Sequence, residues 1–177
     1  MVKKQHFKTL SSYLDYLGLP RPEHPMLSVF NSKGSGYLPC PRESSPPITN
    51  DCYSISFKKY VEGDLNYGRT KYDFTNGALI CIAPRQVLQW DDSVVFEQKG
   101  FSINVHEDFL KGTELAQQLK KYGFFSYAVN EALHLSEQEE KNVVEIFQKI
   151  EKEYQHIDKH TQDIILSQID LLLNYCD

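Results

Sequence analysis

The stretch from residue 51 to residue 105 constrains the fold most, because it is built from short alternating runs. In 51–60, Tyr53, Ile55 and Phe57 alternate with polar residues. A period of two with aromatic and β-branched side chains predicts a strand. Similar runs follow over 65–67, 71–74, 78–83, 87–90 and 94–105, separated by turn signals such as Asn76-Gly77. Many short strands at close spacing predict a sandwich or a small barrel.

The residues before this β-rich body carry a different pattern. Apolar residues recur at helical spacing over 7–17, and Gly18 ends that helix. A proline-rich connector follows, and the apolar run 26–30 predicts an arm or an edge strand. Residues 31–50 contain four prolines and two glycines, which predict a loop with one short strand near Tyr37.

After residue 106 the period changes to that of helices. A short helix is predicted over 114–122 and a short apolar strand over 124–127. Ser136 and Glu139 form a capping-box signature. It marks the start of a helix whose apolar stripe contains Val143, Phe147, Ile150 and Tyr154. After a break at 156–159, a last helix has a stripe with Ile165, Ile169, Leu172 and Cys176. A helix, a run of strands and two long helices together predict an α+β fold.

The apolar surface of the last two helices is wider than a single face. We expect part of it to cover the β-rich body and the remainder to meet the same helices of a second subunit, giving a homodimer. The residues expected at this interface are Val143, Phe147, Ile150, Tyr154, Ile165, Ile169 and Leu172. The alternative is a helical hairpin packed only within its own chain.

Charge and cysteine usage narrow the class of protein. Residues 136–177 hold ten acidic and four basic residues, a net charge of −6 in a chain of net charge −5. Without a basic stripe, direct binding to nucleic acid is not expected. The N-terminus has no apolar signal segment, and no run approaches the roughly 20 apolar residues of a membrane span. The four cysteines lack zinc-site spacing, which favours reduced thiols and a cytoplasmic protein.

Several stretches in a fixed order resemble the N-terminal domain of AraC-family transcription regulators of bacteria. They are DCYSISFK at 51–58, GDLNYGR at 63–69, YDFTNG at 72–77, IAPRQV at 82–87 and GFSINVHEDFL at 100–110. The resemblance implies a cupin-like jelly-roll barrel that binds a small effector, followed by helices that dimerise. It also implies a separate domain with two helix-turn-helix units that would contact DNA, which these 177 residues do not include.

The same resemblance implies one sensor domain with three parts. Residues 1–50 would form a helix and an N-terminal arm, 51–127 the barrel with a short helix, and 128–177 the helical dimerisation element. A metal-binding cupin needs several converging histidine and glutamate ligands. The matching stretch 63–77 offers Tyr67, Arg69, Lys71 and Tyr72 instead, so no metal or cofactor is expected. The serines also lack a nucleophile-elbow context, so we expect no catalytic residue and no enzyme.

Aromatic side chains are the candidates for the effector pocket, because small-ligand sites are mostly apolar with a few polar groups. Tyr53 and Phe57 share a strand face that we place inside the barrel. The other candidates are Tyr67, Tyr72 and Trp90, with His24 expected by family analogy to cover the mouth. Alternatively, these rings only fill a small barrel. The alternative functions are a stand-alone cupin-fold isomerase or oxygenase and a ligand-free assembly module.

Overall fold

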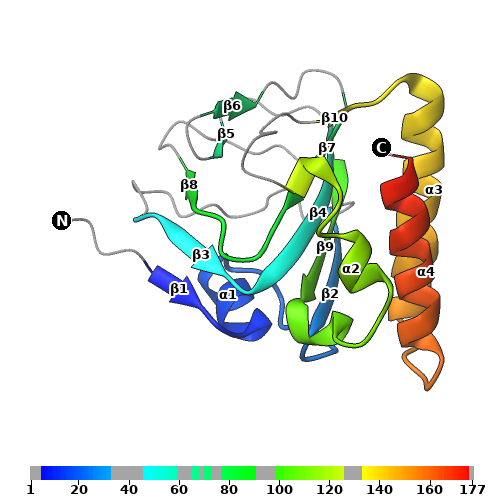
Figure 1. Ribbon diagram of the computed structural model, residues 1–177, viewed down its shortest axis with the longest axis horizontal. Coiled ribbons are helices and arrows are strands. Elements are labelled where there is room, and N and C mark those ends of the chain that lie inside the picture. Colours follow the sequence, from blue (N-terminus) through cyan, green and yellow to red (C-terminus); the bar gives the residue numbers. More distant parts are fainter. Residues whose placement is uncertain are drawn as a thin grey trace.

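The α+β architecture is confirmed by the computed structural model, in which two sheets are followed by two long helices (Figure 1). The structure describes residues 5–32, 46–59, 65–67, 70–72, 77–90, 99–125 and 133–175. Helices α3 (Glu137–Tyr154) and α4 (Thr161–Asn174) lie side by side along one sheet. The strand predicted near Tyr37 lies outside the described residues.

The sheet beside the helices, sheet B, contains five antiparallel strands in the order β10-β7-β4-β9-β2. Their bounds are Leu133–His134, Ala78–Ile82, Cys52–Lys59, Lys99–His106 and Leu27–Asn31. The alternating run predicted over 51–60 forms the central strand β4, which pairs with β9 from Cys52–His106 to Lys59–Lys99. The apolar run predicted as an edge strand is β2, at the border of this sheet.

The second sheet, sheet A, has the order β1-β3-β8-β5-β6. Its strands are Gln5–Phe7, Ile48–Asn50, Leu88–Trp90, Leu65–Tyr67 and Thr70–Tyr72. The antiparallel pairs β5–β6, β4–β7, β3–β8 and β2–β9 are nested around the β5–β6 hairpin. No ladder within the described residues joins a strand of sheet A to one of sheet B, so the predicted closed barrel is not seen there.

Local signals account for the helix ends. Helix α1 (Leu10–Tyr16) begins at Thr9, whose hydroxyl accepts a hydrogen bond from the Ser12 amide at 3.3 Å, and the chain leaves it at Gly18 with φ +68°. It is shorter than predicted because Phe7 belongs to β1. The capping box is confirmed: Ser136 Oγ accepts from the Glu139 amide at 3.4 Å, and Glu139 Oε2 accepts from the Ser136 amide at 2.7 Å.

Three short helical turns connect β9 to the C-terminal part. They are η1 (Glu107–Leu110), α2 (Leu115–Gln118) and η2 (Gly123–Phe125). The predicted strand over 124–127 is wrong at Phe124 and Phe125, which form a 3₁₀ turn. Both rings are buried, and Phe124 stacks on Tyr122 with ring centroids 5.0 Å apart. An apolar run of this length does not distinguish a strand from a buried turn.

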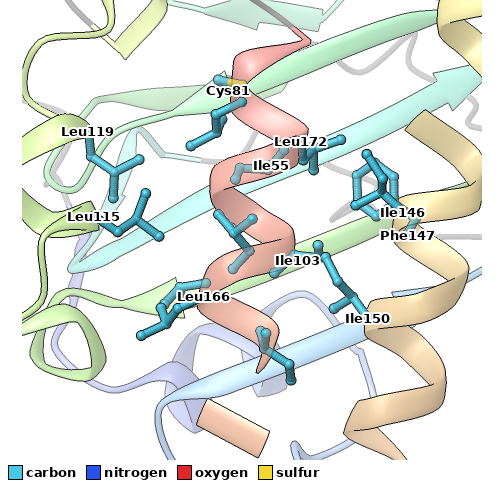
Figure 2. Close-up of a cluster of buried hydrophobic side chains, with 14 of the residues drawn as sticks. Ile55, Cys81, Ile103, Leu115, Leu119, Ile146, Phe147, Ile150, Leu166 and Leu172 are labelled. Atoms are coloured by element: carbon cyan, nitrogen blue, oxygen red, sulfur yellow. The ribbon is translucent and has the colours of Figure 1, made fainter. Parts of the chain in front are cut away.

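Two apolar clusters hold the elements together. The outer core lies between sheet B and the helices (Figure 2). Within it, Phe101 of β9 stacks on Phe147 of α3 with ring centroids 5.3 Å apart. The inner core lies between the sheets and α1, and its members are Phe7, Leu10, Tyr13, Leu14, Ile48, Cys52, Ala78, Ile80 and Leu88. Sheet B is therefore buried on both faces.

The helix residues expected at a dimer interface lie inside the protomer instead. All seven are buried in the outer core: Val143, Phe147, Ile150, Tyr154, Ile165, Ile169 and Leu172. In Figure 2, Leu115 and Leu119 lie on one side of α4 and Ile146, Phe147 and Ile150 on the other. The apolar surface of α4 is wide because sheet B, α2 and α3 all contact it, so a second subunit is not needed to bury these side chains.

Candidate ligand site

The orientation of the two faces of β4 is the reverse of the one predicted from the alternating pattern. Ile55 and Phe57 lie in the outer core, and Tyr53 packs against it. Cys52 belongs to the inner core, so Ser54 and Ser56 share its face toward the inside of the sandwich. The assignment of Tyr53 and Phe57 to the interior is corrected, because the apolar face of β4 is the one that α3 and α4 cover.

The inside face of sheet B carries a set of buried or half-buried uncharged polar side chains, which we call the inner polar row. Its members are Ser28 of β2, Ser54 and Ser56 of β4, and Ser102 and Asn104 of β9. In the register of the sheet, Asn104 lies between Ser28 and Ser54, and Ser56 lies opposite Ser102. Ser54 and Asn104 are each only 4% exposed, although neither is apolar.

Hydrogen bonds link these side chains across three strands. Ser54 Oγ donates to Asn104 Oδ1 at 2.6 Å, and Asn104 Nδ2 donates to Ser28 Oγ at 3.2 Å. The hydroxyls of Ser56 and Ser102 are 2.8 Å apart and share one hydrogen bond. The row thus consists of two hydrogen-bonded groups, the chain Ser54–Asn104–Ser28 and the pair Ser56–Ser102.

These bonds do not use all the donors of the row. An amide has two N–H groups and each hydroxyl has one hydrogen. No described group accepts from the Ser28 hydroxyl or from the second N–H of Asn104, and the Ser56–Ser102 pair uses only one of its two hydrogens. A buried donor without an acceptor costs about 1–3 kcal/mol, so the row suits a bound group with oxygen or nitrogen acceptors.

The other predicted ring positions lie on sheet A. The backbones of Tyr67, Tyr72 and Trp90 occupy the neighbouring strands β5, β6 and β8. Leu65 lies opposite both Tyr72 and Trp90, which places these two backbones in one row across the sheet. The side chains of these three residues lie outside the described part of the structure.

Two further predicted residues, Phe57 and Tyr53, lie in or against the outer core. Tyr53 makes an edge-to-face contact with Phe125 at 5.3 Å, and burial, followed by the nearby Glu107 carboxylate, raises its pKa. Phe57 is buried in the same cluster. Five of the six predicted ring residues are therefore divided between sheet A and the outer core, and His24 is the sixth.

His24 lies beside the outer core rather than over the polar row. Its ring contacts Phe109 edge-on at 5.2 Å, and its Nδ1 accepts a hydrogen bond from the Met26 amide at 3.2 Å. Burial lowers the pKa of the imidazole. These contacts anchor the proline-rich connector, and the structure gives His24 no contact with the inner polar row.

A network of charged side chains lies at the start of β4. Arg85 Nε lies 3.2 Å from Asp51 Oδ1, and the guanidinium also pairs with Glu107. His6 Nε2 lies 3.3 Å from Asp51 Oδ2, which ties β1 to the start of β4. Burial, followed by the carboxylates of Asp51 and Glu107, raises the pKa of the adjacent Cys52 thiol to about 12. That thiol is therefore a poor nucleophile near neutral pH.

Among the described residues, no three histidine, cysteine, aspartate or glutamate side chains converge on a point where they could hold a metal ion. No described helix is long and apolar enough to span a membrane. No family model matches the sequence, and no curated protein matches it. The chemistry of the inner polar row is the basis for assigning a function.

Proposed function

We propose that this chain is the ligand-sensing and dimerisation domain of an AraC-type transcription regulator, with a small polar effector bound at the inner polar row. The observation that carries the proposal is the set of five uncharged polar side chains between the two sheets, of which four are buried and Ser102 is half-buried. An interior needed only for stability gains more from apolar side chains of similar size. A row with unused donors is instead suited to recognise a polar ligand.

The strand order supports the cupin-like jelly-roll fold within this proposal. A jelly roll is a long hairpin that folds over into two sheets, so its strand pairs are nested around one turn. The pairs β5–β6, β4–β7, β3–β8 and β2–β9 have this nesting. Two of the stretches that resemble the AraC family, 51–58 and 100–110, lie on the central strands β4 and β9 and on η1.

The arrangement also gives a route from ligand to helices. Strands β4 and β9 carry the inner polar row on one face and contact α3 and α4 through the outer core on the other. A ligand with different affinity for two positions of these strands would shift the helix pair between two arrangements. DNA contact would then come from a separate domain, since residues 136–177 are strongly acidic.

Thermal-shift screening tests the ligand site. The probes are uncharged monosaccharides, polyols and small amides, which offer hydrogen-bond acceptors. A ligand present at about 100 times its Kd stabilises the folded state by about 2.7 kcal/mol, which raises Tm by roughly 5–10 °C for a chain of this size. We expect at least one probe to give such a shift, with a negative heat-capacity change in calorimetry.

Two variants locate the binding of any such probe. The double change Ser56→Ala with Ser102→Ala removes both partners of one hydrogen bond and should abolish or strongly reduce the shift. The control Ser167→Ala alters an exposed serine on α4 and should keep it. Equal shifts in all three proteins would place the ligand elsewhere. A dimer that responds to no probe would favour the alternative of a ligand-free assembly module.

A further inference from the structure

We infer that the effector bound at the inner polar row is a small hydroxylated ring acid with one carboxylate, and that Lys58 holds this carboxylate. The inference rests on the proposed function and deepens it, because it names the chemical class of the ligand and the residue that selects it. Three features of the inside face of sheet B carry it: the position of Lys58, the small residues beside it, and the ring of Phe30.

Lys58 of β4 lies on the inside face of sheet B. Side chains two residues apart on a strand share a face, so Lys58 is on the same side as Ser54 and Ser56. Its partner on β7, Ala78, is fully buried in the inner core, which agrees with this orientation. The Lys58 side chain is half-buried, and no other lysine, arginine, aspartate or glutamate occupies this face in the described strands of the sheet.

The residues beside Lys58 on both neighbouring strands are small. Lys58 lies opposite Gly100 on β9 and opposite Ala78 on β7. A Cβ added to Gly100 would lie 2.1 Å from the carbonyl oxygen of Phe57, so no larger residue fits there. Neither neighbour presents a carboxylate or a bulky side chain to Lys58. An ammonium has three N–H donors, so Lys58 can bind a ligand carboxylate in addition to a group of the protein.

Lys58 and the inner polar row are spaced to hold one small molecule. Neighbouring side chains on one face of a strand are about 7 Å apart, which is the separation of Lys58 from Ser56 along β4. The hydroxyls of Ser56 and Ser102 share one hydrogen bond, so one of their two hydrogens remains for a ligand. A molecule whose carboxylate accepts from Lys58 and whose hydroxyl oxygen accepts from this pair therefore satisfies both groups together.

Phe30 of β2 adds an apolar ring beside these polar groups. Val29 packs against the outer core, so its neighbour Phe30 shares the inside face with Ser28. In the register of the sheet, Phe30 lies directly opposite Ser102. Its ring is half-buried and belongs to neither apolar cluster of the described residues. A ring beside hydroxyl groups suits a ligand with an apolar face and a polar edge, which favours a ring acid over a short-chain acid.

The number of charges favours a carboxylate over a phosphate ester. A phosphate group carries close to two negative charges near neutral pH and three acceptor oxygens. Phosphate sites usually match these with arginine forks or with several backbone N–H groups at a helix N-terminus. The described part of the inside face offers Lys58 without a second lysine or an arginine, and its elements are strands. One ammonium balances the single charge of a carboxylate.

Calorimetric titration of the full chain with matched probes tests the ligand class. One pair is D-glucuronate and D-glucose, and the other is 3-hydroxybenzoate and 3-hydroxybenzamide. The members of each pair differ at the acid group, and the two pairs distinguish a sugar acid from an aromatic acid. In at least one pair, the acid should bind at least about tenfold more tightly than its neutral partner, because a hydrogen bond between two charged groups is stronger than one between neutral groups.

Substitutions at Lys58 test the residue that selects the acid. Lys58→Met removes the charge and should weaken binding of the acid at least about tenfold, while the Kd of the neutral partner stays within about threefold of the wild type. Lys58→Arg keeps the charge and should retain the preference for the acid. The matched control Lys152→Met removes the same charge from an exposed position of α3, beyond the outer face, and should change neither Kd. If Lys58→Met does not fold by circular dichroism, Lys58→Gln serves as the uncharged variant.

The outcomes separate this inference from the proposed function. A preference for the acid that persists in the uncharged Lys58 variant overturns the inference, and so does a preference that Lys152→Met removes equally. If acid and neutral probes bind the wild type equally, or if only neutral probes bind, the role of Lys58 is lost while the polar site stands. If no acid or neutral probe binds, both the inference and the ligand-sensing proposal fail.

Discussion

The two faces of sheet B are both buried, but they are built from different chemistry. The outer face presents Ile55 and Ile103 to α3 and α4, and at its edge strand Asn31 donates a side-chain hydrogen bond to Glu151 of α3 at 3.0 Å. The inner face presents Ser54 and Asn104 at the same two central strands, joined by a 2.6 Å hydrogen bond. One face therefore stabilises mainly by excluding water, and the other depends on matching donors to acceptors.

This difference shows which face is free to change with function. Apolar packing is non-directional and tolerates exchange of similar volumes. A buried polar network is costly when it is partly satisfied and specific when it is complete. We therefore expect substitutions on the outer face to alter stability most, and substitutions on the inner face to alter both stability and ligand response.

The largest expected effect is on the outer face, at Phe147. This ring is fully buried and stacks on Phe101, so Phe147→Ala should reduce the free energy of unfolding by about 3–5 kcal/mol. Urea or guanidinium unfolding measures it. Phe147→Leu keeps most of the volume and should cost less. A loss below about 1 kcal/mol for the alanine variant would show that α3 is not packed on sheet B as described.

A smaller loss of stability is expected on the inner face. Its size depends on whether a substitution removes one partner of a hydrogen bond or both. Asn104→Ala leaves Ser54 without its acceptor and Ser28 without its donor, and should cost about 1–3 kcal/mol. Ser56→Ala combined with Ser102→Ala removes both ends of a bond and should be nearly neutral in unfolding experiments. Equal losses from the two changes would contradict the hydrogen-bond account of this face.

The sequence predicted the elements well where one local pattern decides them. Alternation located β4 and β9, a short apolar run located β7, and the Ser136 capping box located the start of α3. Elements that depend on distant contacts were not predicted. Strand β1 is three residues long and exists because it pairs with β3, more than 40 residues away along the chain. Closure of the barrel likewise depends on pairing between strands, which alternation does not encode.

The candidate site was harder to predict, because alternation separates two faces without saying which one lies inside. Tyr53 and Phe57 were placed in the interior on the assumption that only one face is buried. The apolar helices that cover the outer face reverse this, and the polar residues Ser54 and Asn104 lie between the sheets. The signal was present: polar residues alternate on both β4 and β9, and pairing brings them together.

The helix that covers the outer face also depends on its cap. Ser136→Ala removes the acceptor for the Glu139 amide and should reduce the free energy of unfolding by about 1 kcal/mol. The hydrogen bonds from Ser136 lower the pKa of Glu139, so its contribution is present above the ordinary carboxyl pKa and is lost as pH falls through the lowered value. Unfolding curves at pH 7 and pH 3 check both points, and an Asp at position 136 should retain the cap.

The smallest expected effect is a pH dependence at the margin of the outer face. Burial lowers the pKa of His24, so the folded state favours the neutral imidazole. The stability that follows is present above the ordinary histidine pKa of about 6.5 and is lost as pH falls toward the folded-state value. Protonation of Nδ1 would also end the hydrogen bond that it accepts from the Met26 amide.

His24→Asn is the matched variant for this effect, because an asparagine oxygen can accept from the amide two residues ahead and does not titrate. The difference between denaturation midpoints at pH 7.5 and pH 5.5 should be smaller in this variant than in the wild type. The other five histidines are common to both proteins, so their titration cancels in the comparison. An unchanged difference would mean that His24 contributes no pH sensitivity.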